Sequence, residues 1–328
     1  MSKITVLGAG GFGIALAKHS YNCGHTVSIW TPFEDEASLL STKRTNERLL
    51  KDIFIPEDIG ITTDMSEVEG SDMIIIAVPS KAVRTVANSL SKYKNYGVVV
   101  NVAKGIEKDT FLRMSEIISE ENPAADVVAL SGPSHAEEVA RKIPTSIVAA
   151  SKNSRAAVFV QQNLSNDYFR IYTSEDIIGV ELGGALKNAI AICAGICDGL
   201  KLGDNSKAAL ITRGLAEMAK LGVKMGADER TFAGLAGIGD LVVTCTSRHS
   251  RNNRFGYLVG SGTDINTALE TVGTVEGFYA VDVAFALAKK YDIQMPIIEV
   301  CHGVLYEGQG VESVVQKLML RPYGSENR

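Results

Sequence analysis

The chain is poor in cysteine, histidine and tryptophan, and these shortages exclude several classes of protein. Its 328 residues include only five cysteines, five histidines and one tryptophan. The cysteines are odd in number and form no CxxC pair, so we expect reduced thiols in a cytosolic protein rather than a disulfide framework. The histidines show neither HxxxH nor HExxH spacing, so we expect no metal site.

Long apolar runs and an excess of one charge are also missing. The longest strongly apolar stretches, such as residues 73–78, fall far short of the roughly 20 residues that span a bilayer, and no signal-peptide pattern precedes the first strand. The net charge of -5 is spread over both signs and gives no field that favours nucleic acid or anionic lipid. We therefore expect a soluble, cytoplasmic protein without a nucleic-acid partner or integral membrane association.

The first half of the chain alternates apolar strands with segments of helical period. Residues 73–78 and 98–102 are apolar throughout, which indicates strands buried on both faces. This pattern predicts an α/β fold, with a Rossmann-type doubly wound parallel sheet and helices on both of its faces. The expected strands are residues 4–7, 27–30, 73–78, 98–102, 127–130, 146–149 and 169–172.

After about residue 174 the strands give way to Ala-, Leu- and Gly-rich segments of helical period. Because 328 residues exceed what one hydrophobic core usually supports, we predict a dinucleotide-binding domain at 1–178 and an all-helical substrate domain at 179–328. A cleft between them would hold the substrate. The expected helices are about 175–200, 205–225, 251–260, 264–271, 276–291 and 295–306.

A glycine-rich motif, GAGGFG at residues 8–13, directly follows the first strand and precedes a helical segment. In that setting Gly8 permits a tight turn, Gly10 lets the backbone approach a pyrophosphate, and Gly13 allows the helix to pack on the strand. A glycine-rich turn without a ligand is the competing interpretation. The order of strand, motif, helix and strand favours dinucleotide binding.

The end of the second strand bears on the choice between NAD and NADP. Residues 30–33 read Trp-Thr-Pro-Phe, the acidic run 34–36 follows, and the first basic residue is Lys43. A 2′-phosphate on the adenosine ribose therefore has no evident partner, which favours NAD. The alternative is that Lys43 or Arg44 folds back to this position.

Two further strands end in polar residues, where ligands gather in open α/β sheets. Lys104 follows an apolar strand and precedes a glycine, so we expect it on the ligand side, although an ordinary solvated lysine is the alternative. Gly132 and Ser134 offer backbone groups and a hydroxyl to a ligand. Alternatively, Ser134 simply caps the helix that starts near Ala136.

In the second half, Lys187 lies in ELGGALKNAIAI, a small and apolar helical segment that is an unusual place for an ammonium. Small residues on its face leave room for a ligand or another backbone, and a lysine that extends out of a core helix is the alternative. Asp240, between a glycine and an apolar run, could pair with a buried lysine or cap a helix.

Ser250, Arg251 and Asn252 begin a helical segment. Free backbone amides at a helix start, combined with a guanidinium, suit a phosphate monoester. A basic and solvated helix terminus is the competing interpretation. On the first interpretation, this segment holds the phosphate of a small substrate.

Together, the segments GAGGFG, AVPS, NVAKGIE, SGPSHAEE, ELGGALKNAIAI, GIGDLVVTC, HSRNNRFG and TVEGF resemble the NAD(P)-dependent glycerol-3-phosphate dehydrogenases in order and spacing, over about residues 3–320. The resemblance implies a homodimer that supplies glycerol 3-phosphate for phospholipid synthesis. It departs from the family at Pro32, where many members carry a basic residue or histidine near the adenosine.

The resemblance also implies roles for individual residues, with Lys187 as the catalytic lysine. The implied substrate-binding residues are Lys104, Gly132, Ser134, Lys187, Asp240, Ser250, Arg251 and Asn252. The cofactor-binding residues expected from the motif and the resemblance are Gly8, Gly10, Gly11, Phe12, Gly13, Pro32, Lys104, Ala136, Arg251 and Glu276.

The expected reaction is reversible hydride transfer between NAD(P)H, with NAD favoured, and dihydroxyacetone phosphate. Lys187 would give a proton to the carbonyl oxygen as the alkoxide forms. Two alternatives stay open: another two-domain hydroxyacid dehydrogenase, and a dinucleotide-sensing protein without catalysis.

Overall fold

The computed structural model describes residues 1–322 and 325–326. Contacts divide the chain into two compact units, unit 1 (Met1–Gly184 and Gly226–Asp240) and unit 2 (Ala185–Met225 and Leu241–Arg328). The boundary predicted after residue 178 falls inside a long helix, α7 (Ile177–Gly199). The sequence pattern did not indicate that residues 226–240 return to unit 1.

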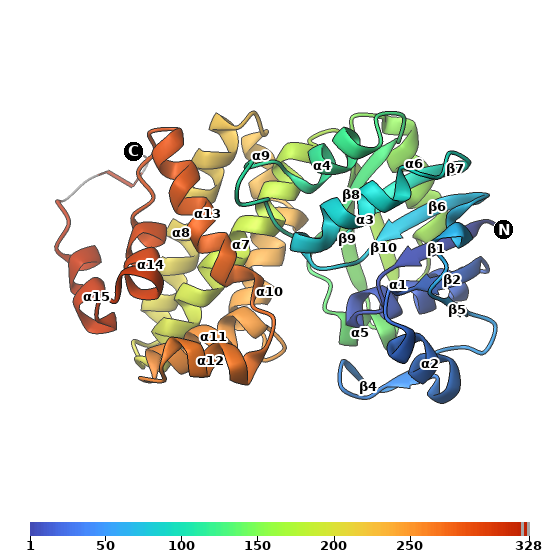
Figure 1. Ribbon diagram of the computed structural model, residues 1–328. Coiled ribbons are helices and arrows are strands. Elements are labelled where there is room, and N and C mark those ends of the chain that lie inside the picture. The colour runs from blue at the N-terminus through green and yellow to red at the C-terminus, as the bar shows by residue number, and fades with distance from the viewer. Residues whose placement is uncertain (323–324, 327–328) are drawn as a thin grey trace. The chain divides into compact units, whose positions relative to one another are not determined.

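Unit 1 is built on an eight-stranded sheet in the order β10-β9-β8-β7-β6-β1-β2-β5 (Figure 1). All seven predicted strands are present, whereas β5, with three residues, was too short to be recognised. A separate two-stranded hairpin, β3 (Thr45–Asn46) and β4 (Leu50–Phe54), follows α2 (Glu34–Lys43). The strands of the main sheet are β1 (Lys3–Leu7), β2 (Thr26–Trp30), β5 (Gly60–Thr62), β6 (Ser71–Ile76), β7 (Tyr96–Asn101), β8 (Val127–Ser131), β9 (Thr145–Ala150) and β10 (Phe169–Ser174).

One strand pair corrects the prediction of a parallel sheet, because β9 runs antiparallel to β8. A strand parallel to β8 would need a connection that first returns the chain along the full length of β8. The helix between these strands, α5 (Ala136–Ala140), has five residues and rises only about 7.5 Å. A strand with the same number of residues spans roughly 16 Å. The helix is therefore too short to return the chain along such a strand, and the chain turns back instead.

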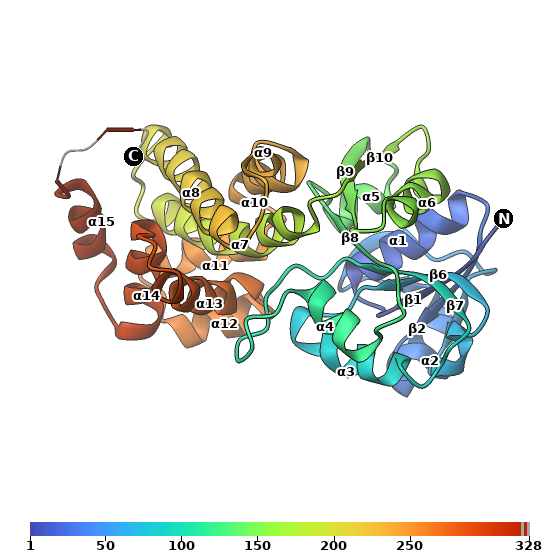
Figure 2. The ribbon, with the colours of Figure 1, turned by 90° about the horizontal axis from the view of Figure 1, so that it is seen from above.

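Helices cover both faces of the sheet, as the apolar strands predicted. Met73 and Ile75 pack with α1 (Gly11–Asn22), α5 and α6 (Ser154–Leu164), whereas Ile74 and Ile76 pack on the opposite face with α3 (Val83–Leu90) and α4 (Met114–Glu121). Figure 2 shows the two layers, with α5 and α6 above β1, β6 and β7 and with α3 and α4 below these strands. Two short turns of helix flank β6: η1 (Met65–Val68) precedes the strand and η2 (Ser80–Ala82) leads from it into α3.

The register of the central strands brings the ligand loops to one edge. Leu7 at the end of β1 is level with Trp30 of β2 and Ile76 of β6. The parallel strand β7 continues this alignment next to β6. The glycine-rich motif and the loops after β2, β6 and β7 therefore leave the sheet at the same edge.

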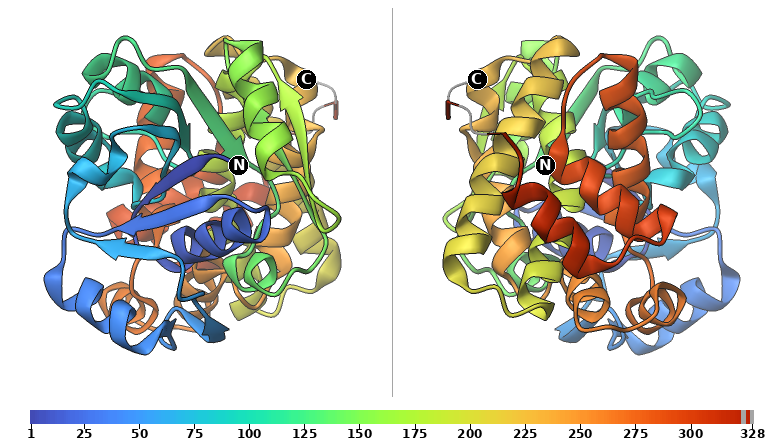
Figure 3. Two further views of the ribbon diagram at one scale, coloured as in Figure 1. Left: turned by 90° about the vertical axis from the view of Figure 1, so that its right-hand side faces the viewer. Right: turned by 90° about the vertical axis from the view of Figure 1, so that its left-hand side faces the viewer.

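Outside unit 1's strands the second half is helical, and the six predicted helices are confirmed. The right view in Figure 3 shows α8, α13 and α14 side by side, in agreement with their contacts. Three helices were missed, together with a short π-helical turn, η3 (Leu235–Gly239); two of them have only four and seven residues, whereas the third has nine residues with apolar positions at helical spacing and was overlooked. The predicted helices are α7, α8 (Asp204–Lys224), α11 (Arg251–Gly260), α12 (Ile265–Val272), α13 (Glu276–Lys290) and α14 (Pro296–Glu307); the missed ones are α9 (Glu229–Phe232), α10 (Asp240–Thr246) and α15 (Val311–Met319).

Helix α7 is the longest helix of the described chain, and by length and composition alone it could cross a membrane, a feature that the sequence analysis overlooked. Its most apolar window is 94% buried inside the protein, which is typical of a core helix. Glycines allow this burial. A Cβ atom on Gly195 would lie 2.1 Å from the carbonyl oxygen of Asn253, and one on Gly256 would lie 2.1 Å from that of Ile192, so α7 and α11 pack backbone to backbone.

Candidate active site

The glycine-rich loop of unit 1 has the geometry that dinucleotide binding requires. Gly8 has φ +122°, and a Cβ atom there would lie 2.8 Å from the oxygen of Ala77; one on Gly13 would lie 2.1 Å from the oxygen of Gly8. A Cβ atom on Gly10, by contrast, would meet nothing within 4 Å. Gly10 is the N-cap of α1, so the open space lies at the amino end of a helix, where a pyrophosphate fits.

The neighbouring cofactor candidates lie on the same loop and on α5. Gly11 and Phe12 form the first turn of α1, which carries no acidic side chain. Phe12 also packs against the core on the face of the sheet that α1, α5 and α6 cover. Ala136 is the first residue of α5, and Pro32 is exposed just beyond β2.

Lys104 is held in place by two groups rather than solvated: a carbonyl just after β8 and a carboxylate at the start of α10. Its Nζ donates to the oxygen of Gly132 at 3.0 Å and to Oδ2 of Asp240 at 2.6 Å. The Asp240 side chain is 2% exposed and that of Lys104 is 20% exposed, so a buried carboxylate fixes a partly accessible ammonium. The proposed pairing of Asp240 with a lysine is therefore present, with Lys104 as the partner.

Gly132 and Ser134 complete this part of unit 1. Gly132 has φ +144°, and its oxygen also accepts from the Ser134 hydroxyl at 3.0 Å. The alternative that Ser134 caps the next helix is wrong, because α5 begins at Ala136 with His135 at its N-cap and no side-chain capping bond. The Ser134 hydroxyl instead supports the carbonyl that holds Lys104.

In unit 2, Lys187 lies on α7 with its side chain inside the protein. The residue is 5% exposed, and its Nζ donates to Oγ1 of Thr244 at 2.8 Å. The alternative of a lysine that extends from the core into solvent does not fit this burial. An ammonium in such a place keeps a polar partner because leaving it unpaired would be costly.

The residue after Lys187 organises two other helices of unit 2. Asn188 Oδ1 accepts from the side-chain amide of Asn252 at 2.9 Å, and Asn252 Oδ1 accepts from the backbone N–H of Gly277 at 2.9 Å. These buried amides join α7, the start of α11 and the start of α13. Asn252 therefore belongs to a hydrogen-bond network that includes Asn188, the residue next to Lys187.

The start of α11 presents the basic group expected for phosphate. Ser250 is the N-cap, and its buried hydroxyl accepts from the backbone N–H of Asn253 at 3.2 Å. Arg251, the first residue of the helix, is exposed, and Glu276 begins α13. A cationic side chain beside the free amides of a helix amino end favours a bound anion.

Thr244 is the partner of Lys187 that the sequence analysis missed. It lies one helical turn after Asp240 on α10, a helix that was not predicted. An aspartate and a threonine four residues apart share a helix face. The sequence GDLVVTC would have shown that Asp240 and Thr244 share a helix face only once residues 240–246 were recognised as helical.

A buried ion pair was also missed. In unit 1, Glu181 of α7 accepts from Nη1 of Arg113 at 2.5 Å, and from both the backbone N–H and the hydroxyl of Ser115, at 2.7 and 2.6 Å. Burial raises the pKa of the Glu181 carboxyl despite these donors. The network anchors the first turns of α7 to the start of α4.

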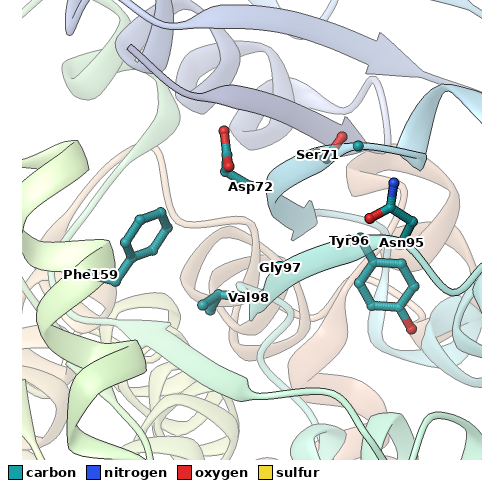
Figure 4. Close-up of a pocket in the computed structure, with 8 residues that line it drawn as sticks. Ser71, Asp72, Asn95, Tyr96, Gly97, Val98 and Phe159 are labelled. Atoms are coloured by element: carbon teal, nitrogen blue, oxygen red, sulfur yellow. The ribbon is translucent and has the colours of Figure 1, made fainter.

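A depression of about 410 Å³ lies away from these residues, at the opposite edge of the sheet (Figure 4). It is formed where β6 and β7 begin, around Asp72 and Tyr96, with Phe159 of α6 facing it. Asp72 already accepts the backbone N–H of Lys3 at 2.8 Å. Ligands of open α/β sheets bind at the carboxyl ends of the strands, so this depression is not the candidate site.

The fold and these side chains define a nicotinamide-dependent dehydrogenase with a Rossmann-type cofactor unit and a helical unit that carries a buried lysine. The sequence patterns of two family regions match the chain: the N-terminus of NAD-dependent glycerol-3-phosphate dehydrogenase over residues 3–157, and its C-terminus over residues 176–316. This chain belongs to the NAD-dependent glycerol-3-phosphate dehydrogenase family.

Relatives cover nearly the whole chain. It is 49% identical to glycerol-3-phosphate dehydrogenase [NAD(P)+] of Fusobacterium nucleatum, covering 98% of this chain and 97% of that one. It is 50% identical to the enzyme of the same name from Bacillus subtilis, covering 98% and 95%. The crystal structure of glycerol-3-phosphate dehydrogenase from Coxiella burnetii is similar with a TM-score of 0.93 and 38% identity, covering 98% and 99%.

A more distant likeness concerns the fold alone. D-mandelate dehydrogenase, in a structure with NADH and anilino(oxo)acetate, has a TM-score of 0.64 at 13% identity, covering 95% of this chain and 99% of that one. The same architecture therefore occurs in enzymes with other substrates.

Proposed function

We propose that this chain catalyses reversible hydride transfer between NAD(P)H and dihydroxyacetone phosphate, which yields sn-glycerol 3-phosphate. The observation that carries the proposal is the buried ammonium of Lys187, hydrogen-bonded to the Thr244 hydroxyl at 2.8 Å. A general acid in a dry site suits reduction of a carbonyl, because negative charge develops on its oxygen. The nicotinamide cofactor, when bound, supplies or accepts the hydride.

Lys187 has the central role in proton transfer. Its ammonium donates to the carbonyl oxygen and releases a proton as the alkoxide forms; in the reverse direction the neutral amine accepts the alcohol proton. Thr244 orients the amine through the bond to Nζ. The hydroxyl can accept from the ammonium and donate to the neutral amine, so it supports both protonation states.

Lys104 acts as a fixed positive charge. Within the described part of the chain, Gly132 and Asp240 take two of its three N–H groups, and the third is assigned to a ligand. Asp240 holds the ammonium at a defined point beside the strand ends. We assign Lys104, Gly132 and Ser134 to binding of substrate and cofactor on unit 1.

The start of α11 binds the phosphate in this proposal. Arg251 supplies a guanidinium, Ser250 supplies the cap of the helix, and the backbone near Asn252 supplies amide donors. Glu276 and Arg251 also contribute to the cofactor site, as the family resemblance implied. A dianionic phosphate is favoured by both the charge and the helix amides.

The remaining parts of the proposal concern the cell and the assembly. We propose a cytoplasmic homodimer, without integral membrane association, that supplies glycerol 3-phosphate for phospholipid synthesis. The family membership supports the metabolic role.

The deciding experiment follows the absorbance of NADH and of NADPH separately, with dihydroxyacetone phosphate and with a panel of small 2-ketoacids. Rapid oxidation with the phosphorylated ketone supports the proposal. Preference for a ketoacid would favour another hydroxyacid dehydrogenase. Cofactor binding without oxidation of any substrate would indicate a dinucleotide sensor.

A further inference from the structure

We propose that unit 1 selects NAD over NADP through Glu36, whose carboxylate is held at the end of β2 by Thr31. The inference rests on the proposed function, because it concerns the cofactor of the same reaction. It assigns discrimination to two residues outside the glycine-rich loop. It also explains how the chain differs from relatives that carry a base near the adenosine.

The end of β2 is joined directly to the glycine-rich loop. The backbone N–H of Gly8 donates to the oxygen of Trp30 at 2.8 Å. In a Rossmann fold the pyrophosphate lies on that loop, and the adenosine ribose lies at the end of the second strand. Whatever occupies the space just beyond Trp30 therefore meets the 2′ position of the ribose.

Glu36 occupies that position. The hydroxyl of Thr31, which is 1% exposed, donates to Oε2 of Glu36 at 2.5 Å. Glu36 is half-buried, and among the described residues its Oε1 has no hydrogen-bond partner. A carboxylate can only accept, so it suits a ribose hydroxyl, which donates, and it repels a phosphate.

The start of α2 strengthens this discrimination. The helix begins after Phe33, whose side chain provides no cap. Open backbone amides at such a helix end would ordinarily attract a phosphate. Here the first turn carries Glu34, Asp35 and Glu36; Glu36 is half-buried while the other two are exposed, so its carboxylate is the least screened and opposes a second anion most strongly.

The basic residues that could have folded back are placed elsewhere. Arg44 Nη1 donates to the oxygen of Ile59 at 2.7 Å, and Arg44 Nε lies 3.5 Å from Oε2 of Glu57. Lys43 ends α2, whose ten residues place it about 14 Å along the axis from Glu34. Neither side chain is therefore positioned to meet a phosphate at the end of β2.

One rival remains, on the β3–β4 hairpin. Leu49 approaches the glycine-rich loop, since its oxygen would lie 3.5 Å from a Cβ atom on Gly11. The preceding residue, Arg48, is exposed and has no ion-pair partner within the described part of the chain. We therefore test the Arg48 guanidinium as the alternative ligand of a 2′-phosphate.

The single tryptophan of the chain provides a direct measurement of binding. Trp30 is 7% exposed, ends β2 and donates from its indole N–H to the oxygen of Thr63. Its fluorescence can be titrated with NADH and NADPH, and then with 5′-AMP and adenosine 2′,5′-bisphosphate, which differ only in the 2′-phosphate. We expect NADH to bind at least roughly tenfold more tightly than NADPH, and 5′-AMP more tightly than the bisphosphate.

Three variants separate Glu36 from the general negative charge of α2. Glu36→Gln should reduce the NADH preference by about tenfold. Asp35→Asn removes the same charge from the same turn and should change the preference by less than about twofold, because an exposed charge is screened. Thr31→Val releases the Glu36 carboxylate without changing any charge and should reduce the preference to an intermediate value.

The outcomes are distinct. Equal or tighter binding of NADPH by the unaltered chain overturns the inference. If Arg48→Ala then loses NADPH binding, Arg48 is the base that holds the 2′-phosphate. Equal effects of Glu36→Gln and Asp35→Asn overturn the specific role of Glu36. Failure to bind either dinucleotide overturns the cofactor part of the proposed function, and this inference with it.

Discussion

At the scale of single residues, Lys187 donates to Thr244 from a helix whose other residues are mostly apolar and buried. The helix around Lys187 is built from alanine, isoleucine and glycine, and the neighbours Leu186 and Ala189 are almost fully buried. Removing a charge from water in this way is unfavourable unless a partner is present. A role in the reaction therefore explains a buried lysine at this position better than a contribution to stability does.

Lys187→Ala should lower kcat by roughly 100- to 10,000-fold, because the proton donor is lost. Binding of NADH, measured by Trp30 fluorescence, should persist, since Trp30 and the glycine-rich loop belong to unit 1. Lys224→Ala on the exposed side of α8 is the control and should retain full activity. Turnover close to that of the unaltered enzyme in Lys187→Ala would remove the lysine from the mechanism.

Arg251 allows a test of phosphate recognition with a pair of substrates. A charge-assisted hydrogen bond contributes about 1.5 to 3 kcal/mol, so Arg251→Ala should lower kcat/KM for dihydroxyacetone phosphate by about 10- to 150-fold. The weak activity on dihydroxyacetone, which has no phosphate, should barely change. Equal losses with both substrates, together with a raised KM for NADH, would assign the arginine to the cofactor alone.

At the scale of elements, α14 depends on a carboxylate from another helix. Its N-cap residue, Met295, has no side-chain capping bond, and Pro296 has no N–H. Glu217 of α8 instead accepts from the backbone N–H groups of Ile297 at 2.9 Å and Ile298 at 3.4 Å. Burial raises the pKa of Glu217 to about 7 from its ordinary 4.5.

The raised pKa of Glu217 predicts how pH affects unit 2. The folded protein binds this proton more tightly than the unfolded chain does, so the contribution is fully present below about pH 4.5 and is lost as pH rises through about 7. The loss should be about 3 kcal/mol in the free energy of unfolding. Glu217→Gln cannot ionise, so the free energy of unfolding, measured in urea at pH 5 and pH 8, should lose this dependence on pH. If the variant shows the same difference between the two pH values as the unaltered protein, Glu217 is not the group responsible.

At the scale of the whole molecule, the two units contain buried groups that respond to pH in opposite directions. In unit 1, the ring of His19 is buried, and its Nε2 lies 2.7 Å from the oxygen of Leu164. Nε2–H therefore donates to that carbonyl. Burial lowers the pKa of His19 to about 4 from 6.5, so its contribution is present above pH 6.5 and is lost as pH falls through about 4.

Hydrogen exchange resolved by mass spectrometry should separate the two responses. As pH falls from 6.5 to 4, peptides of α1 and β10 should lose about 3 kcal/mol of protection from unfolding, whereas peptides of α8 and α14 should not. His19→Gln keeps a donor and an acceptor but cannot be protonated, so it should abolish the acid response of unit 1. Parallel loss in both units would show that they unfold together.

Sequence patterns predicted those features that depend on neighbours along the chain. The isoleucines of β6 alternate between two buried faces, and the GAGGFG turn, with Gly8 at φ +122°, requires glycine for local reasons. Lys187 was recognised because its immediate surroundings are apolar. The missed helices α9 and α10 are short, and packing rather than an apolar period stabilises such segments.

The sequence by itself therefore determined the α/β class and the glycine-rich loop and indicated the candidate site residues, because backbone preference and apolar period act over a few residues. Only the tertiary structure decided the antiparallel direction of β9 and the partners of the buried charges. Lys104 meets Asp240 across 136 positions of the chain, and Glu217 meets Ile297 across 80. Such pairs are selected by the cost of an unpaired buried charge, which has no signature at either residue alone.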